Sequence, residues 1–281
     1  MESEIKLSVC VEGGKTLLKD SYYNAPYKVV HYGSQRSNKH IELIIMSSSP
    51  GIMDEDHLNI DIDVADQAHL HLYSQSYNKL HPMKHGASQR TVVHVGHQAL
   101  LQYIPHPITP FKDSIFTTVN HVHLQSGATL LWGDIICAGR IHRNEIFEFQ
   151  KMHSTTKIYR EGQLLYIDNQ VLKPKEQPID KLLFHEGHTH QATLIFASEY
   201  ASEFKKELDE IFRSEYHDIT FGFTRCAHDM ILFRALGDNG DLLYNFLKTI
   251  ASMCLDFVAH KRPNAVASDE EIMAPFEKEL L

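Results

Sequence analysis

The chain has 281 residues, of which 43% are hydrophobic and 22% charged, a composition typical of a folded soluble protein with one large domain or two small ones. Its formal net charge is -9 with histidine neutral. An acidic chain repels phosphate backbones, so we expect no nucleic-acid partner. No apolar stretch of about 20 residues is present, so we expect no membrane span. The first residues lack the basic and apolar regions of a signal peptide, which favours a cytoplasmic location.

Most of the chain, up to about residue 172, resembles a series of short strands separated by turns. Residues 58–64 alternate strictly between apolar and polar side chains, which is typical of a strand with one buried face. Further strands are predicted at 5–11, 41–46, 68–72, 91–95, 99–104, 115–124, 128–137, 155–160 and 163–172, and again at 219–224 and 230–236. Strands this short and this numerous predict a mainly β architecture, which could be a sandwich, a barrel or a β-helix.

Two helices are predicted near the C-terminus. Apolar residues recur at helical spacing after Ser198 and again after Asn239, and either polar side chain can cap the helix that follows it. The segment from about 263 to 281 begins with Pro263-Asn264 and ends with several glutamates, so we expect a mobile or partner-ordered tail. We treat residues 1–281 as a single domain.

Histidine is unusually frequent, with 20 residues in the chain. Three pairs have one residue between the two histidines: His69 and His71, His121 and His123, and His188 and His190. On a strand such a pair points to one face, where two imidazoles could hold a transition metal weakly. The simpler interpretation is that each pair is a set of exposed polar positions, and we favour it.

The carboxylates offer a second set of candidates. Asp61 and Asp63 share one face of a predicted strand, and Asp56 ends the acidic turn before it. Asp134 lies inside an otherwise apolar strand, so it either faces solvent or is buried with a partner, because an unpaired buried charge is very costly. Glu145 lies close to Arg140 in sequence, and the simpler interpretation of this pair is a surface ion pair.

Enzyme hypotheses follow from these residues but lack a motif. No G-x-S-x-G, P-loop or H-E-x-x-H sequence is present. A carbohydrate-active β-helix enzyme would need two carboxylates facing one bond, a role that Asp61 and Asp134 could fill only if the fold brought them together. A cupin-like metal enzyme would need a glutamate soon after a histidine pair, and none follows closely.

A resemblance to a known family rests on several segments in a fixed order. Residues 101–111 follow the pattern L-x-Y-x-P-x-P-x-x-P-F, residues 126–135 read SGATLLWGDI, and residues 138–147 resemble P/A-G-R-x-x-R-x-E-x-F. Segments 49–53, 74–80, 185–190 and 234–237 also match in order and spacing. Together they resemble the UreD, or UreH, family of urease accessory proteins. One departure is the turn at 54–56, where the family commonly has Gly-Gly-Asp and this chain has Asp-Glu-Asp.

The resemblance implies a fold, a role and a set of residues. The implied fold is an elongated, mainly β structure with β-helix-like winding of many short strands and two C-terminal α-helices. The implied role is that of a non-catalytic chaperone that binds apo-urease and the accessory proteins UreF and UreG. Nickel would be cargo in transit through an internal acidic tunnel, with no tightly bound cofactor. By position, Asp61, Asp63, Asp134 and Glu145 match the family's acidic positions, with Asp56 as a further candidate and Arg140 as an orienting partner.

Overall fold

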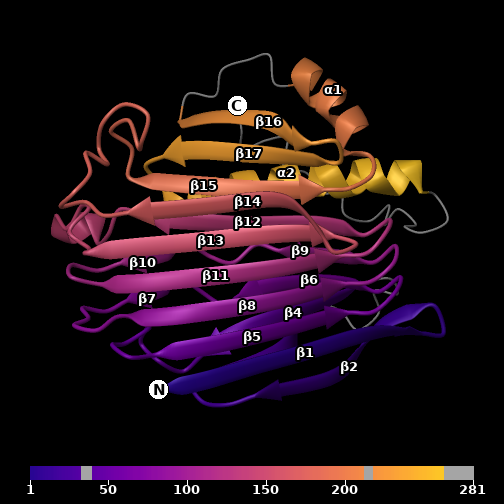
Figure 1. Ribbon diagram of the computed structural model, residues 1–281, viewed down its shortest axis with the longest axis horizontal. Helices are drawn as coiled ribbons and strands as arrows, with labels where there is room; N and C mark the ends of the chain where they lie inside the picture. Colours follow the sequence, from indigo (N-terminus) through magenta and orange to yellow (C-terminus); the bar gives the residue numbers. More distant parts are fainter. Residues whose placement is uncertain (33–39, 212–217, 263–281) are drawn as a thin grey trace.

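The computed structural model describes residues 1–32, 40–211 and 218–262, which form two β-sheets packed face to face with helices behind the larger sheet (Figure 1). The seven-stranded sheet consists, in spatial order, of β14 (Gln163–Leu172), β13 (Lys151–Arg160), β11 (Ile115–Leu124), β8 (Ala87–Val95), β5 (His57–Val64), β1 (Glu2–Glu12) and β2 (Lys15–Tyr23). The ten-stranded sheet consists of β16 (Ile219–Ala227), β17 (Met230–Gly237), β15 (His190–Ala197), β12 (Thr129–Cys137), β9 (Leu100–Tyr103), β6 (His69–Ser74), β4 (Ile41–Ser47) and β3 (Tyr27–Tyr32), with β7 (Asn78–Leu80) and β10 (Ile108–Pro110) beside this path.

The chain winds between the two sheets in the manner of a β-helix. From β4 to β13 it alternates between the ten-stranded and the seven-stranded sheet, and β7 and β10 are short additions to the former. Successive strands within each sheet are therefore parallel, as in the pairs β5–β8, β8–β11 and β11–β13. The expectation of a mainly β chain with many short, wound strands is confirmed. The four cysteines are free, in agreement with their wide spacing.

The two C-terminal helices cover the outer face of the ten-stranded sheet. Helix α2 (Gly240–Lys261) begins where expected, because the side chain of Asn239 accepts hydrogen bonds from the backbone N–H groups of Asp241 and Leu242. Helix α2 passes a length and composition test for a membrane span, but it lies against β12, β15 and β17 and buries one face there. Helix α1 (Ala201–Ile211) begins three residues after Ser198.

Three hydrophobic clusters hold these layers together. The largest fills one part of the space between the sheets, the second lies between the ten-stranded sheet and the helices, and a smaller third lies at the opposite end of the strands from the first. Strands β2 and β3 were not predicted from the sequence. They are largely exposed, with only Thr16 and Val29 buried, so they lack the alternation that identified the other strands.

The tail from residue 263 lies outside the described residues, and the expectation that it is mobile or ordered by a partner stays a prediction.

Candidate functional site: a polar layer between the sheets

Two rows of polar side chains lie on four neighbouring strands of the inner face of the seven-stranded sheet. The strand register places Thr91, Asn120, Thr156 and Asp168 side by side on β8, β11, β13 and β14, and places Gln89, Thr118, Ser154 and Gln170 in the adjacent row. We call these eight residues the polar layer. Thr91, Thr118, Asn120 and Thr156 are each at most 7% exposed. The polar layer is therefore an interior feature of the sandwich.

Apolar rows flank the polar layer on both sides. The next row in one direction is Val93, Val122 and Ile158, and the next in the other is Ala87, Phe116, Met152 and Leu172. The first of these rows belongs to the largest hydrophobic cluster, and the second to the cluster at the opposite end of the strands. The polar layer thus separates two hydrophobic cores that share the same strands.

The facing sheet contributes a matching row. Strand pairing aligns Asp134 of β12 with Thr193 of β15, and Thr193 with Arg234 of β17. Leu130 and Trp132 pack into the core between the sheets. Asp134 comes two positions later and so points the same way.

Contacts between the sheets close the layer at one side. The Arg234 guanidinium donates to Asp168 Oδ2 at 2.8 Å, and Gln170 Nε2 donates to Gln191 Oε1 at 2.7 Å. Both bonds join the edge strand β14 to the opposite sheet. The polar layer therefore meets the polar row of the ten-stranded sheet at this edge.

Hydrogen bonds within the layer use part of its capacity. Asn120 Nδ2 donates to Thr156 Oγ1 at 3.0 Å, and Thr118 Oγ1 donates to Ser154 Oγ at 3.0 Å. Amide and hydroxyl groups can each make several hydrogen bonds, and buried groups of this kind commonly bind interior water. The layer has the chemistry of a hydrated interior.

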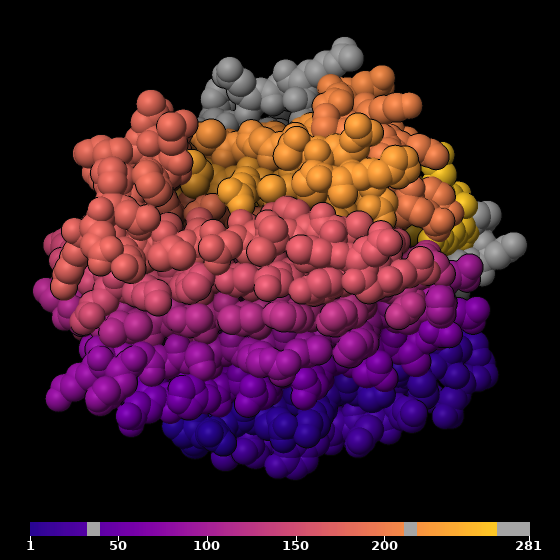
Figure 2. All heavy atoms as spheres, viewed as in Figure 1, coloured from indigo at the N-terminus to yellow at the C-terminus, as the bar shows by residue number. Residues whose placement is uncertain are grey.

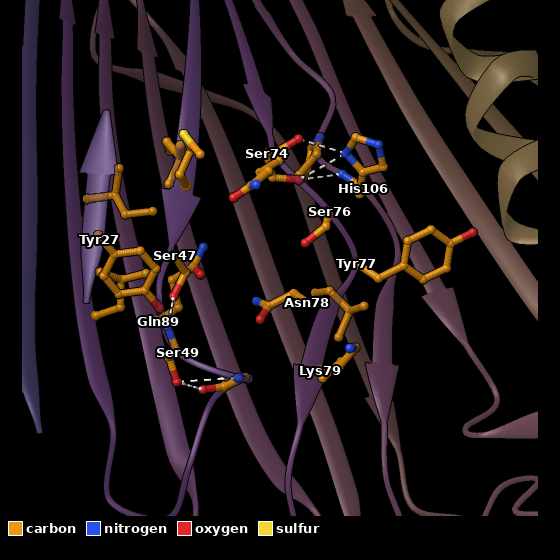
Figure 3. Close-up of a pocket in the computed structure, with 18 of the residues that line it drawn as sticks. Tyr27, Ser47, Ser49, Ser74, Ser76, Tyr77, Asn78, Lys79, Gln89 and His106 are labelled. Atoms are coloured by element: carbon orange, nitrogen blue, oxygen red, sulfur yellow. Dashed lines mark hydrogen bonds between the residues drawn. The ribbon is translucent and has the colours of Figure 1, made fainter. Parts of the chain in front are cut away.

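A cavity opens at each end of the polar layer. The first, of about 220 Å³, is lined by Gln89 from the seven-stranded sheet, by Tyr27 and Tyr103 from the other, and at its rim by Lys79 and His106 (Figure 3). The second, of about 340 Å³, lies at the edge formed by β14, β16 and β17. It is lined by Gln170, Gln191 and Arg234, together with residues of the segment between β14 and β15.

That segment also presents apolar side chains to solvent. It protrudes from the body of the molecule beside β15 (Figures 1 and 2). Leu182 and Leu183 are 74% and 87% exposed, and Leu183, Phe184 and His185 border the second cavity. Exposed apolar side chains clustered at a cavity are typical of a protein contact surface.

Asp134 is the acid whose ionisation the interior changes most clearly. Burial, together with the nearby Asp168 carboxylate, raises the pKa of Asp134 to about 7, against the opposing effects of Arg234 and a hydrogen bond from Thr193. A carboxyl group with this pKa exchanges its proton near neutral pH. It can therefore switch between a neutral form and a cation-binding form under ordinary conditions.

The other predicted strand acids lie elsewhere. Asp61 and Asp63 are on the outer face of β5, because Ile60 and Ile62, which alternate with them, are buried between the sheets. They border a shallow surface cavity with Lys6 and His94, away from Asp134. Asp61 and Asp134 thus do not face one groove, which is the arrangement that a glycosidase requires.

Asp56, Glu145 and Arg140 are held in loops. Asp56 accepts a hydrogen bond from the Met53 N–H and an ion pair from the N-terminal amine. Both carboxylate oxygens of Glu145 accept from Arg140, with the Arg140 Nε–Glu145 Oε2 distance 2.8 Å, and these bonds lower the pKa of Glu145. Neither acid touches the polar layer, so their part in a nickel path stays a prediction.

The three histidine pairs do not converge. His69 and His71 are on the outer face of the ten-stranded sheet, and His121 and His123 are on the outer face of the other. His188 lies in the loop before β15 and contacts Asp238, and His190, the first residue of β15, is buried. A single histidine-lined cupin centre is not formed by these residues.

Most of the polar layer was missed from the sequence, although one signal was present. In residues 115–124, Thr118 and Asn120 occupy the same face as Phe116 and Val122. Polar residues at core positions of an alternating strand mark either an exposed strand or a polar interior. The alternation alone does not distinguish these two cases.

Comparison with known proteins identifies the family. The family model described as UreD urease accessory protein matches residues 1–267. Urease accessory protein UreD of Acetivibrio thermocellus is 34% identical over 253 residues, which cover 90% of this chain and 97% of that protein. Urease accessory protein UreD of Flavobacterium johnsoniae is 34% identical, covering 84% and 86%, and urease accessory protein UreH of Helicobacter hepaticus is 28% identical, covering 85% and 92%. The chain belongs to the UreD family of urease accessory proteins.

Proposed function

We propose that this protein passes nickel to apo-urease along the polar layer, between the two cavities at its ends. Membership of the family supports a role in urease maturation. The observation that carries the finer proposal is the interruption of the hydrophobic core by two rows of polar side chains on β8, β11, β13 and β14, which lead from one cavity to the other. Polar groups inside a sandwich cost stability unless they are satisfied, so a functional reason for them is favoured.

The chemistry of the layer suits an ion that must move on. Its residues are mostly neutral oxygen and amide groups, which bind a hydrated divalent cation weakly, as a path for conduction requires. Asp168 neutralises Arg234 at the second cavity, so Asp134 is the acid left to attract the cation. We expect nickel transfer to increase as the pH rises through about 7, because Asp134 becomes ionised.

The partners in this proposal are apo-urease, UreF and UreG. The exposed side chains of Leu182 and Leu183 beside the second cavity support a docked protein there, because a partner would bury them and continue the path into its own interior. The protein in this proposal is a scaffold with no catalytic step of its own, and nickel is its cargo.

The test is co-expression with UreF, UreG and the urease subunits, comparing Asp134→Asn with Asp61→Asn. Both changes replace an acid with its neutral amide, but one lies inside the sandwich and the other on its surface. We expect Asp134→Asn to keep the captured complex and to lower the nickel content of urease about tenfold. This is the lower end of the loss in metal affinity or activity that follows when a polar group supporting a metal site is mutated. Asp61→Asn should load urease normally.

Two results would contradict the proposal. Normal nickel content with Asp134→Asn would remove the acid from the path. Failure of the unchanged protein to capture any of the partners would remove the scaffold role. Leu183→Asp separates the two parts, because it should weaken partner capture without touching the polar layer.

A further inference from the structure

A group of three potential metal ligands lies on the opposite face of the ten-stranded sheet from the polar layer. His40 immediately precedes β4, and Glu42 is two positions later and so shares its face. The parallel pairing of β4 with β6 places His71 directly opposite Glu42. The alternate residues Leu43 and Leu72 point into the core between the sheets. Backbone register therefore brings the three side chains together on the outer face.

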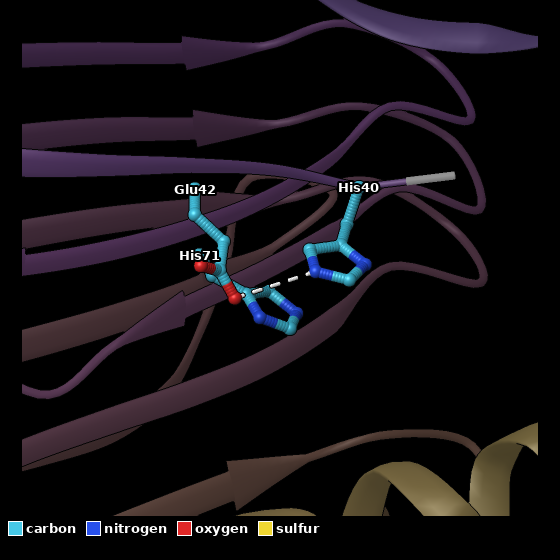
Figure 4. A group of neighbouring side chains, drawn as sticks. All are labelled: His40, Glu42 and His71. Carbon is cyan, nitrogen blue, oxygen red and sulfur yellow. Dashed lines mark ion pairs between the residues drawn. The ribbon is translucent and has the colours of Figure 1, made fainter. Parts of the chain in front are cut away.

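The three side chains converge closely (Figure 4). One ligand atom from each of His40, Glu42 and His71 lies within 4.8 Å of the other two. His40 Nε2 is 3.5 Å from Glu42 Oε1, and the two imidazole rings stack with centroids 4.3 Å apart. Ligands bound at about 2.1 Å are at most about 4.2 Å from one another. Small side-chain rotations would thus close the group around an ion.

The surroundings favour ligation over a simple ion pair. All three side chains are half-buried, and the His71 ring stacks on His40 beside the carboxylate of Glu42. The side chains of His40 and Glu42 remain 21% and 27% exposed, which leaves an approach from solvent.

We propose that His40, Glu42 and His71 bind a first-row divalent transition-metal ion, with water completing its coordination. Two imidazoles and one carboxylate suit Ni²⁺ or Zn²⁺, whereas Mg²⁺ prefers oxygen ligands alone. This site does not depend on the proposed passage, because it lies on the outer face of the sheet whose inner face carries Asp134. It is a separate place at which the protein holds an ion.

The chain contains a matched control. His94 and His123 also stack, with centroids 4.9 Å apart, on the outer face of the seven-stranded sheet. No third ligand joins them among residues 1–32, 40–211 and 218–262, where His40, Glu42 and His71 form the one such group. Stacked imidazoles occur at both places. Only the first place also has a carboxylate, that of Glu42, which the strand pairing puts opposite His71.

The experiment is equilibrium dialysis and calorimetric titration of the untagged full-length protein with Ni²⁺ alone, Zn²⁺ alone and Mg²⁺ alone. We expect the unchanged protein to bind one equivalent of Ni²⁺ or Zn²⁺ at its tightest site and to show no such site for Mg²⁺. Glu42→Gln and His71→Ala should each weaken that site at least about tenfold. The control His94→Ala with His123→Ala, and Asp134→Asn, should leave it unchanged.

Each alternative result decides the question. Retention of the tightest site in Glu42→Gln would overturn the proposal, as would its loss in Asp134→Asn, which would assign the ion to the interior between the sheets. Glu42→Gln changes neither size nor ring packing, so it remains informative even if His71→Ala fails to fold. Circular dichroism of each variant checks the fold.

Discussion

The polar layer and the apolar rows beside it use the same strands in the same register and differ only in position along them. On β11, Phe116 and Val122 are fully buried in separate hydrophobic clusters, while Thr118 and Asn120 between them belong to the polar layer. Alternation decides which sheet face a side chain occupies. It does not decide whether that part of the interior is apolar or polar, and here hydrophobic rows and the polar layer share one sheet face.

The apolar rows should carry stability. Phe116→Ala removes a fully buried ring and should lower the free energy of unfolding by about 3–5 kcal/mol. Chemical denaturation followed by circular dichroism measures this loss. A loss below about 1 kcal/mol would mean that this cluster can collapse around the cavity, and that the contrast between the rows is weaker than their burial indicates.

Replacing Asp134, which faces the polar layer from the ten-stranded sheet, should change the free energy of unfolding in the opposite direction. Because the pKa of Asp134 is raised to about 7 in the folded protein, the unfolded chain releases this proton more readily than the folded one. Its contribution to stability is therefore complete below about pH 4 and is lost as the pH rises to about 7. Asp134→Asn removes this loss, so it should be the more stable protein at pH 8 by up to about 4 kcal/mol, with little difference at pH 4.

Denaturation of both proteins across pH 4 to 8 measures that difference. Its growth with pH, levelling above about 7, is the expected result. A constant difference would indicate that Asp134 is already ionised or solvated in the folded state, and the comparison would then lose its electrostatic basis.

Much of the fold was predictable because its signals are local. Strict alternation identified β5, and Asn239 was recognised as a cap because capping depends on residues two and three positions away. Strands β2 and β3 were not predicted, since an exposed strand has little apolar periodicity. The assignment of strands to sheets depends on pairing between distant segments, which no local pattern contains.

The candidate site shows the same limit. Asp134 was singled out because an acid in an apolar strand is unusual. Its neighbours Arg234 and Asp168 lie on two other strands and are 66 residues apart in the sequence. His71 was noted with His69 through their spacing, whereas the residues that converge with it are His40, just before β4, and Glu42, on β4. Sequence spacing found single participants, and strand register determined their partners.

A paired change within the polar layer should separate stability from function. Replacing both partners of the Asn120–Thr156 hydrogen bond, as Asn120→Leu with Thr156→Val, should change the free energy of unfolding by only about 1 kcal/mol in either direction. The same variant should lower nickel incorporation into co-expressed urease, because the apolar pair excludes water from the layer. Thr156→Val alone, which leaves Asn120 without its acceptor, should be the less stable protein of the two.

The smallest effect is expected on the outer face of the same sheet. Asp61→Asn with Asp63→Asn changes two acids that lie beside the apolar residues Ile60 and Ile62 in sequence but face away from the interior. Surface substitutions of this kind usually alter stability by no more than about 0.5 kcal/mol. We expect urease nickel content to be unchanged as well, measured by the same co-expression assay. A marked loss of nickel would show that a second path runs over the outer face of β5, and the acids of this strand, matched to the family by position, would then matter more than the interior rows.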